Sequence, residues 1–227
     1  MIHWQEPGYV VAFTMRVGGV STGVYESLNL TTGTGDRAET VEENRRIACA
    51  ALGLDASLLA FNRQVHSPNV HRASAGDRGA PGDGLWTDEP LLPMLAMSAD
   101  CLPIAIARRE GPRALAVVHA GWRGLAEGVV AAGADAIGAG AKAAVIGPAV
   151  GPCCYEVGAE VAALFADDLT VDRRLDLWTA AERALRAAGV EHVERTDLCT
   201  RCHPELFFSH RRSGTARGVQ GVIGAVV

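Results

Sequence analysis

The chain has 227 residues, a length that suits one large domain or two small ones. Its formal net charge of −5 gives no electrostatic argument for binding nucleic acid or an anionic membrane. Hydrophobic residues make up 48% of the chain but aromatic residues only 5%, so the core is expected to consist mainly of Ala, Val, Leu and Ile.

Strands and helices are predicted from apolar runs and capping signals, taken in chain order. A strand over 9–14 precedes a glycine-rich turn and a helix that Thr40-Val-Glu-Glu43 would cap and Gly53 would end. Segment 74–84 is the strongest loop signal. Further strands are predicted at 58–65, 68–73, 91–98, 103–108, 113–118, 142–147, 206–210 and 219–227. Further helices are predicted at 124–137, 157–166 and 179–189, the last with a second capping box, Thr179-Ala-Ala-Glu182.

These elements alternate without a strict βαβ rhythm, so we expect a mixed sheet within one domain. No uncharged apolar run of about 18 residues predicts a transmembrane helix. The N-terminal residues show neither the basic start nor the apolar run of a signal peptide. We therefore expect a cytoplasmic protein whose six cysteines are reduced. The sequence shows neither a heptad pattern nor a long exposed apolar edge, so we expect a monomer.

The reactive side chains of this sequence lie in three short motifs, QVHS, ADCLP and HAGWRG. These motifs contain His66, Cys101 and His119, respectively. All three residues lie at or just past predicted strand ends, where sites are usually built. Two imidazoles and one thiolate would hold zinc with one coordination position left open, as in a catalytic site. Taken singly, each would be a structural histidine or a small buried cysteine. The neighbouring Asp100 and Arg123 favour a site, because charged side chains are costly to bury without purpose.

A second cysteine pattern, Cys199-Thr-Arg-Cys202-His203, spells the C-x-x-C-H of c-type haem attachment. Haem attachment needs an export route, which the sequence does not show, so haem is not expected. A second metal or redox role shared with Cys153 and Cys154 is the alternative to packing as inert thiols.

Further sequence motifs cover most of the chain and follow one another in a fixed order between residues 14 and 214. They are TMRVGGVSTGVYESLNL, GD-x5-EENRR, QVHS, GDGLWTD, SADCLP, HAGWRG, IGPAVGPCCYEVG, CT and FFSHRRSG. The chain resembles the YfiH-like, laccase-domain family, also called the polyphenol oxidase or purine nucleoside phosphorylase family. The resemblance implies a single α+β domain over 1–227, a four-layer α/β/β/α sandwich with mixed sheets grouped with cysteine-hydrolase-like folds.

The resemblance also implies a zinc site at His66, Cys101 and His119, with copper as the alternative metal. It places Arg16 in the pocket as a catalytic residue, where a guanidinium suits an anion such as phosphate.

Further substrate-binding candidates are Asn44, Gln64 and Arg123, together with Arg211 and Arg212 near the C-terminus. Two other positions carry weaker expectations. Asp83 in GDG is expected to be a turn residue rather than an acid catalyst. Thr215-Ala-Arg217 departs from the Gly-Arg that often ends the family's last word.

Several functions agree with this site. Phosphorolysis of adenosine, inosine or methylthioadenosine suits zinc, with phosphate held by Arg16 attacking the ribose carbon while the base leaves. Trp122 is expected either to stack on the base or to pack in the core. Attack of water on the purine ring would instead deaminate adenosine. An amidase that edits peptidoglycan precursors would use Cys101 as nucleophile and His66 or His119 as base. A copper-dependent polyphenol oxidase is the third alternative. A multicopper laccase is excluded, because the chain has seven histidines and no His-x-His.

Overall fold

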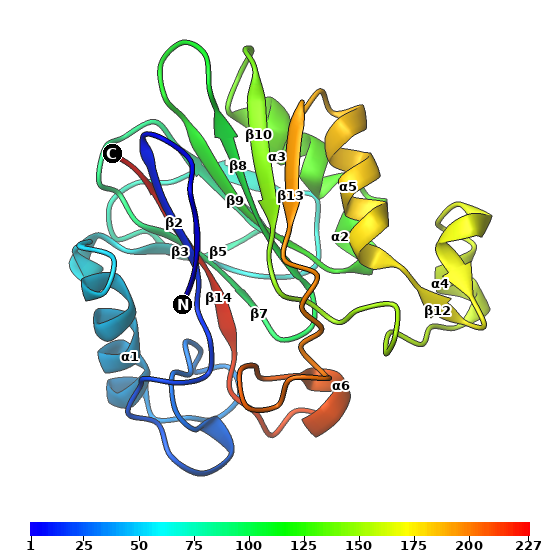
Figure 1. Ribbon diagram of the computed structural model, residues 1–227. Coiled ribbons are helices and arrows are strands. Elements are labelled where there is room, and N and C mark those ends of the chain that lie inside the picture. The colour runs from blue at the N-terminus through cyan, green and yellow to red at the C-terminus, as the bar shows by residue number, and fades with distance from the viewer.

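The computed structural model describes residues 1–227, and its architecture rests on two six-stranded sheets (Figure 1). The first sheet contains, in spatial order, β1 (Ile2–Trp4), β2 (Tyr9–Phe13), β14 (Gln220–Val226), β7 (Met94–Ser98), β3 (Ala60–Arg63) and β5 (Arg78–Pro81). Its first four strands pair antiparallel, whereas β3 runs parallel to both β7 and β5. The sheet is therefore mixed, as expected.

The second sheet is mixed in the same way and carries the central strands of the molecule. Its order is β13 (His192–Arg195), β10 (Lys142–Ile146), β8 (Leu102–Arg108), β9 (Leu115–Ala120), β6 (Gly84–Thr87) and β4 (Val70–Arg72). The inner pairs are antiparallel and the two edge pairs are parallel. Every residue of β9 is buried, which matches its continuous apolar sequence.

Three apolar clusters hold the layers together. Side chains of both sheets, including Phe13, Met94 and Val117, form the core between the sheets. Helix α1 (Ala38–Ala50) packs on the outer face of the first sheet. Helices α3 (Val129–Ala136) and α5 (Leu177–Ala187) cover the outer face of the second.

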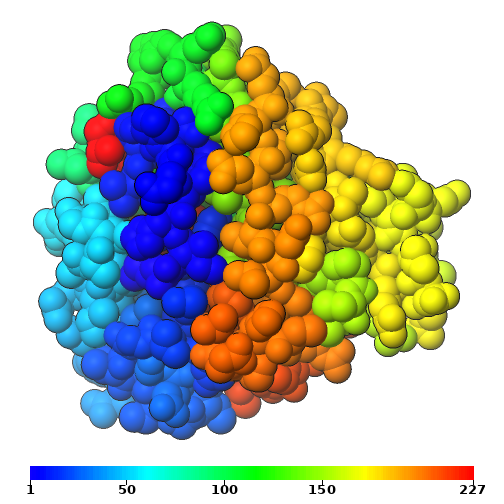
Figure 2. All heavy atoms as spheres, viewed as in Figure 1, coloured from blue at the N-terminus to red at the C-terminus, as the bar shows by residue number.

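Shorter elements complete the chain: helices α2 (Trp122–Ala126), α4 (Ala159–Ala162) and α6 (His210–Ser213) and the hairpin of β11 (Thr170–Val171) and β12 (Arg174–Leu175). Figure 2 shows the segment with α4 and β12, in yellow, projecting from one side of the body. On the face in view, the N-terminal segment lies against the segment that follows α5, and Trp4 Nε1 donates a hydrogen bond to Glu194 at 2.9 Å.

The single α+β domain with mixed sheets is confirmed. The formal four-layer assignment and the kinship with cysteine hydrolases stay predictions. None of the helices has the length and apolar character needed to span a lipid bilayer.

The predicted strand at 206–210 is wrong. Phe207 and Phe208 are buried there, but no strand pairs with them; the side-chain amide of Gln220 bonds both the N–H and the C=O of Phe208. Ser209 then caps α6 through its hydroxyl. The short apolar run predicts a strand, but a side chain, not a neighbouring strand, satisfies the backbone of Phe208.

Two predicted helix starts are also wrong. Helix α1 begins at Ala38, ahead of the predicted cap at Thr40. Helix α5 begins at Leu177, where Asp176 accepts a hydrogen bond from the Thr179 N–H.

Two segments were assigned the wrong structure. The single helix predicted at 124–137 is divided into α2 and α3 at Gly128, whose φ of +93° is left-handed. The loop predicted at 74–84 contains β5, an exposed edge strand without an alternating apolar pattern.

Candidate metal centre

The fold brings together the two imidazoles and the thiol that the sequence singles out. The candidate ligand atoms of His66, Cys101 and His119 all lie within 4.8 Å of one another. Cys101 Sγ is 3.8 Å from His66 Nε2, and the two imidazole rings lie edge to face with centroids 5.0 Å apart.

Antiparallel pairing explains this convergence. His119 is on β9 opposite Pro103 of β8, so the turn that carries Cys101 lies beside it. His66 belongs to the turn after β3, where its φ of +61° is left-handed. The three residues thus come from two sheets whose strand ends meet at one edge.

Asp83 connects the turn of His66 to the imidazole of His119. Its buried carboxylate accepts a hydrogen bond from His119 Nδ1 at 2.9 Å. The same carboxylate accepts the backbone N–H groups of Val65, His66 and Ser67 at 3.1, 3.0 and 2.7 Å. This arrangement fixes the His119 tautomer and leaves Nε2 free to face Cys101, as partners of metal-bound histidines do. Asp83 therefore stabilises a turn, as the sequence predicts, and it also orients His119.

The electrostatics of the centre favour charged side chains despite burial. Burial alone would raise the pKa of Cys101, but the two imidazoles outweigh it and lower the pKa to about 6. Burial would lower the pKa of His119, but the Cys101 thiolate and Asp83 raise it to about 9. Hydrogen bonds from His119 and from the turn backbone hold the pKa of Asp83 well below its ordinary range, again against burial. A thiolate at neutral pH is the form of cysteine that binds metals.

Asp100 holds Cys101 in place from the other side. Its φ of +97° is a left-handed conformation that side chains other than glycine rarely adopt. The buried carboxylate accepts the Thr200 hydroxyl at 2.6 Å and the Arg211 N–H at 2.6 Å, and the carbonyl accepts the Val150 N–H at 2.9 Å. These contacts stabilise the strained turn that presents the thiol.

The geometry of the donor set fits a tetrahedral zinc ion. Ideal Zn–N and Zn–S bonds place nitrogen and sulfur about 3.6 Å apart across a tetrahedron, close to the 3.8 Å between His66 Nε2 and Cys101 Sγ. A Cβ on Gly121 would lie 2.7 Å from His66 Cδ2 and 3.1 Å from Cys101 Sγ. Glycine is therefore required where the chain passes the ligands. Three protein ligands leave a fourth position open to the cavity.

The ligands lie in the wall of a cavity of about 860 Å³, within the range of ligand-binding pockets. Trp122, Tyr155, Arg211 and Arg217 also line it. An adjoining cavity of about 450 Å³ shares Arg217 with it. The centre is therefore accessible to a substrate with several functional groups.

Three polar atoms of the cavity residues have no protein partner. Thr34 Oγ1, Ser98 Oγ and Arg217 Nε are all buried without a hydrogen bond. Burial lowers the pKa of Arg217, and Arg217 makes its one side-chain hydrogen bond to the Gly214 carbonyl. Unpaired donors beside a metal-ligand set are suited to an oxygen-rich ligand, because a buried polar group without a partner is costly.

The predicted substrate-binding residues are distributed differently. Gln64 lines the cavity, but its amide pairs with both the N–H and the C=O of Met97 on β7. Arg123 does not line the cavity; its guanidinium lies 5.0 Å from the Trp122 ring. Arg211 does line it and donates to the Glu156 carbonyl. Arg212 is turned toward backbone carbonyls, including that of Thr200.

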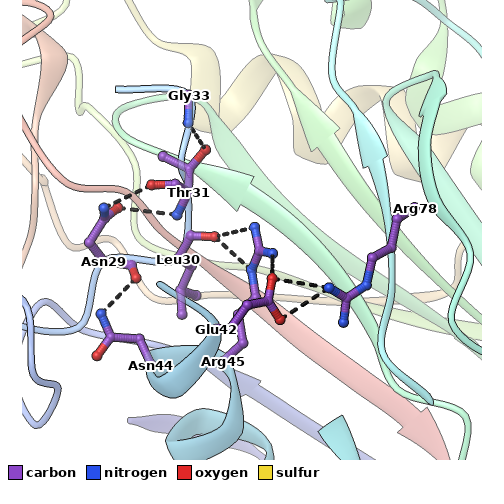
Figure 3. Close-up of polar contacts among 8 residues, drawn as sticks. All are labelled: Asn29, Leu30, Thr31, Gly33, Glu42, Asn44, Arg45 and Arg78. Carbon is purple, nitrogen blue, oxygen red and sulfur yellow. Dashed lines mark hydrogen bonds and ion pairs between the residues drawn. The ribbon is translucent and has the colours of Figure 1, made fainter. Parts of the chain in front are cut away.

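Asn44 has a supporting position rather than one in the cavity wall. Figure 3 shows it donating to the Asn29 carbonyl, while Arg45 donates to the Leu30 carbonyl. Asn44 Oδ1 accepts the Val20 N–H. These bonds anchor the segment that leads to Thr31, which lines the cavity.

Arg16 lies outside the cavity lining. Its Nε donates to the Glu26 carbonyl at 2.9 Å and one terminal nitrogen donates to the Pro204 carbonyl at 2.8 Å. The guanidinium also lies 4.9 Å from the Phe208 ring. Arg16 thus joins two loops, and the arginines that line the cavity are Arg63, Arg211 and Arg217 instead.

Comparison with known proteins shows the family of this chain. Residues 10–226 match the family described as multi-copper polyphenol oxidoreductase laccase, and the chain belongs to that family. It is 34% identical to purine nucleoside phosphorylase YfiH of Escherichia coli (strain K12), with 93% of this chain and 92% of that protein aligned. It is 37% identical to a purine nucleoside phosphorylase of Streptomyces coelicolor, over 93% of both chains.

A solved structure shows the same fold. The crystal structure of YlmD from Geobacillus stearothermophilus superposes with a TM-score of 0.88 and 30% sequence identity, covering 100% of this chain and 99% of that one.

Proposed function

We propose that the protein is a zinc-dependent purine nucleoside phosphorylase. The observation that carries the proposal is one cavity that combines a His₂Cys ligand set with three arginines, one of which has an unpaired donor. Relatives at 34% and 37% identity are named purine nucleoside phosphorylases, which supports the same class of enzyme. We expect it to act in the cytoplasm as a monomer.

His66, Cys101 and His119 would hold the zinc ion. Zinc bound there would supply a Lewis acid and an acidified water ligand at neutral pH. The protein contributes the orientation: Asp83 keeps His119 Nδ1 protonated, and Asp100 holds the turn of Cys101.

Phosphate would bind to Arg217 and Arg211, which supply charge-assisted hydrogen bonds. A phosphate oxygen then forms a bond to the ribose anomeric carbon, while the bond to the purine nitrogen breaks and its electron pair leaves with the base. The purine nitrogen takes up a proton, and the products are free base and ribose-1-phosphate. Trp122 and Tyr155 offer aromatic faces to the base within the same cavity. Adenosine, inosine and methylthioadenosine are the substrates that we propose.

A product assay on protein of measured zinc content tests the proposal. Each of the three nucleosides is incubated with and without phosphate, and base, ribose-1-phosphate and ribose are quantified. We expect ribose-1-phosphate in equimolar amount with base, and no cleavage after zinc is removed by chelation. Cleavage that needs no phosphate, or that survives loss of zinc, would overturn the proposed mechanism. Inosine formed from adenosine would show that water also attacks the purine ring, which is the deaminase activity.

Two cysteine variants test whether the reaction takes place at this metal centre. Cys101→Ala should lose turnover and the zinc ion of this centre, whereas Cys49→Ala should change neither, because Cys49 is buried in α1 against the outer face of the first sheet.

A cysteine amidase is the second candidate. Its support is the pairing of a Cys101 thiol whose pKa is lowered to about 6 with a His119 whose pKa is raised to about 9. Such a thiolate–imidazolium pair is the activated nucleophile of cysteine hydrolases. Metal-free protein that cleaves an amide in a peptidoglycan precursor, and loses this activity when Cys101 is alkylated, would favour the amidase. Activity that requires zinc would exclude it.

A further inference from the structure

Four cysteines form a second cluster outside the catalytic cavity. Cys153 and Cys154 lie in the loop after β10, and Cys199 and Cys202 lie in the loop after β13. Their Sγ atoms all lie within 4.8 Å of one another. The cluster unites the C-x-x-C word with the adjacent pair of cysteines, and the proposed reaction uses none of them.

The sulfur geometry fits a tetrahedron around one ion. Cys202 Sγ is 3.4 Å from Cys154 Sγ and 3.7 Å from Cys153 Sγ. Four Zn–S bonds of about 2.3 Å place tetrahedral sulfurs about 3.8 Å apart, whereas a disulfide requires about 2.05 Å. Sulfurs this close leave room for a single ion and not for a cluster of irons.

The backbone around Cys199 is arranged to stabilise a thiolate. The Gly151 N–H donates to Cys199 Sγ at 3.3 Å. Arg212 donates to the carbonyls of Thr200 and Arg201, which places a positive charge beside the turn between Cys199 and Cys202. A metal-bound set of four thiolates needs such compensation, because it carries net negative charge with a divalent ion.

We propose that Cys153, Cys154, Cys199 and Cys202 form a structural site for one zinc ion. All four positions are protein ligands, so the site is closed to substrate, as structural zinc sites are. The ion would join two loops that already run side by side, since Ala149 and Cys199 form a β-bridge.

The bound ion would also stabilise the wall of the catalytic cavity. Val150 and Tyr155, next to the first pair of cysteines, line that cavity. Thr200, inside the C-x-x-C turn, bonds the Asp100 carboxylate that holds the turn of Cys101. Loss of the ion should therefore loosen the cavity wall without removing a catalytic ligand.

Metal analysis separates the two sites without relying on activity. Full-length protein and its variants are purified under reducing conditions, and zinc per chain is measured by mass spectrometry. We expect two equivalents in the wild type and in Cys49→Ala, but one in Cys202→Ser and one in Cys101→Ala. A wild type with one equivalent that Cys202→Ser keeps and Cys101→Ala loses would overturn the second site, while leaving the proposed catalytic centre intact.

A second measurement covers the case in which Cys202→Ser does not fold. Cobalt is loaded into Cys101→Ala, which retains all four cysteines of the second site. We expect the d–d absorption of tetrahedral Co²⁺ with strong thiolate charge transfer, and a Tm that falls by at least about 5 °C when the ion is chelated. Folded Cys101→Ala without this spectrum, or with an intramolecular disulfide between Cys154 and Cys202, would overturn the proposal.

Discussion

Replacing Asp83 with asparagine removes the carboxylate that contacts both sides of the metal centre. Five donors point at it: His119 Nδ1, three backbone N–H groups of the His66 turn and the Ser67 hydroxyl. An asparagine keeps one acceptor oxygen but turns an NH₂ group toward the remaining donors. Loss of such a partner typically weakens metal affinity 10–100-fold, which is about 1.4–2.7 kcal/mol.

The stability of the metal-free protein should fall as well. Removing one partner from a buried charged pair costs about 3–5 kcal/mol, and Asp83 is buried against His119. The pKa of Asp83 is depressed in the folded state, so its contribution is fully present above the unfolded pKa of about 3.9. That contribution is lost as the pH falls through the folded-state pKa. The stability difference between wild type and Asp83→Asn should therefore be largest near neutral pH and shrink in acid.

Zinc affinity is measured by competition with a chromophoric chelator, and the free energy of unfolding by urea titration of chelated protein. Asp88→Asn is the matched control, because Asp88 is exposed and bonds only Arg72 outside the centre. Equal zinc affinity in wild type and Asp83→Asn would refute the role of Asp83 in holding His119.

Three further predictions concern the cavity. In metal-free protein, alkylation of Cys101 should follow a thiolate whose pKa is about 6, so its rate should level off near neutral pH; a midpoint above pH 8 would contradict the ion pair. Gly121→Ala should lose the catalytic zinc, because its Cβ would lie 2.7 Å from His66 Cδ2, and retained stoichiometry in metal analysis would contradict this crowding. Arg217→Ala should raise the KM for phosphate by roughly tenfold or more through a lost charged hydrogen bond, whereas the exposed control Arg37→Ala should not; equal KM values in steady-state kinetics would move the phosphate site elsewhere.

The sequence could predict the central strands because burial on both faces produces continuous apolar runs. The segments predicted at 103–108 and 113–118 correspond to β8 and β9 within a few residues. The candidate ligands were found for a related reason, since His66, Cys101 and His119 follow or end such runs. Short-range sequence patterns are thus sufficient to predict both the central strands and the candidate ligands.

Supporting residues were missed because their roles depend on distant pairings. Asp83 reaches His119 only because β6 pairs with β9, with Gly84 opposite Val118. Arg217 was passed over because nothing near it in sequence shows that its guanidinium borders the cavity. Arg16, which the family resemblance places in the pocket, does not line the cavity and donates its hydrogen bonds to the carbonyls of two loops.

The family name raises the question of what one ion can do in this protein. Of the seven histidines, two meet at the metal centre, and the other group of metal-capable side chains consists of cysteines alone. A multicopper oxidase must pass electrons from one copper to further coppers held mostly by imidazoles, and the second group offers none. A single His₂Cys site with an open position suits polarisation and binding of a substrate oxygen better than electron relay. Copper would compete well for the same ligands, so oxidase activity should scale with added copper and phosphorolysis with zinc.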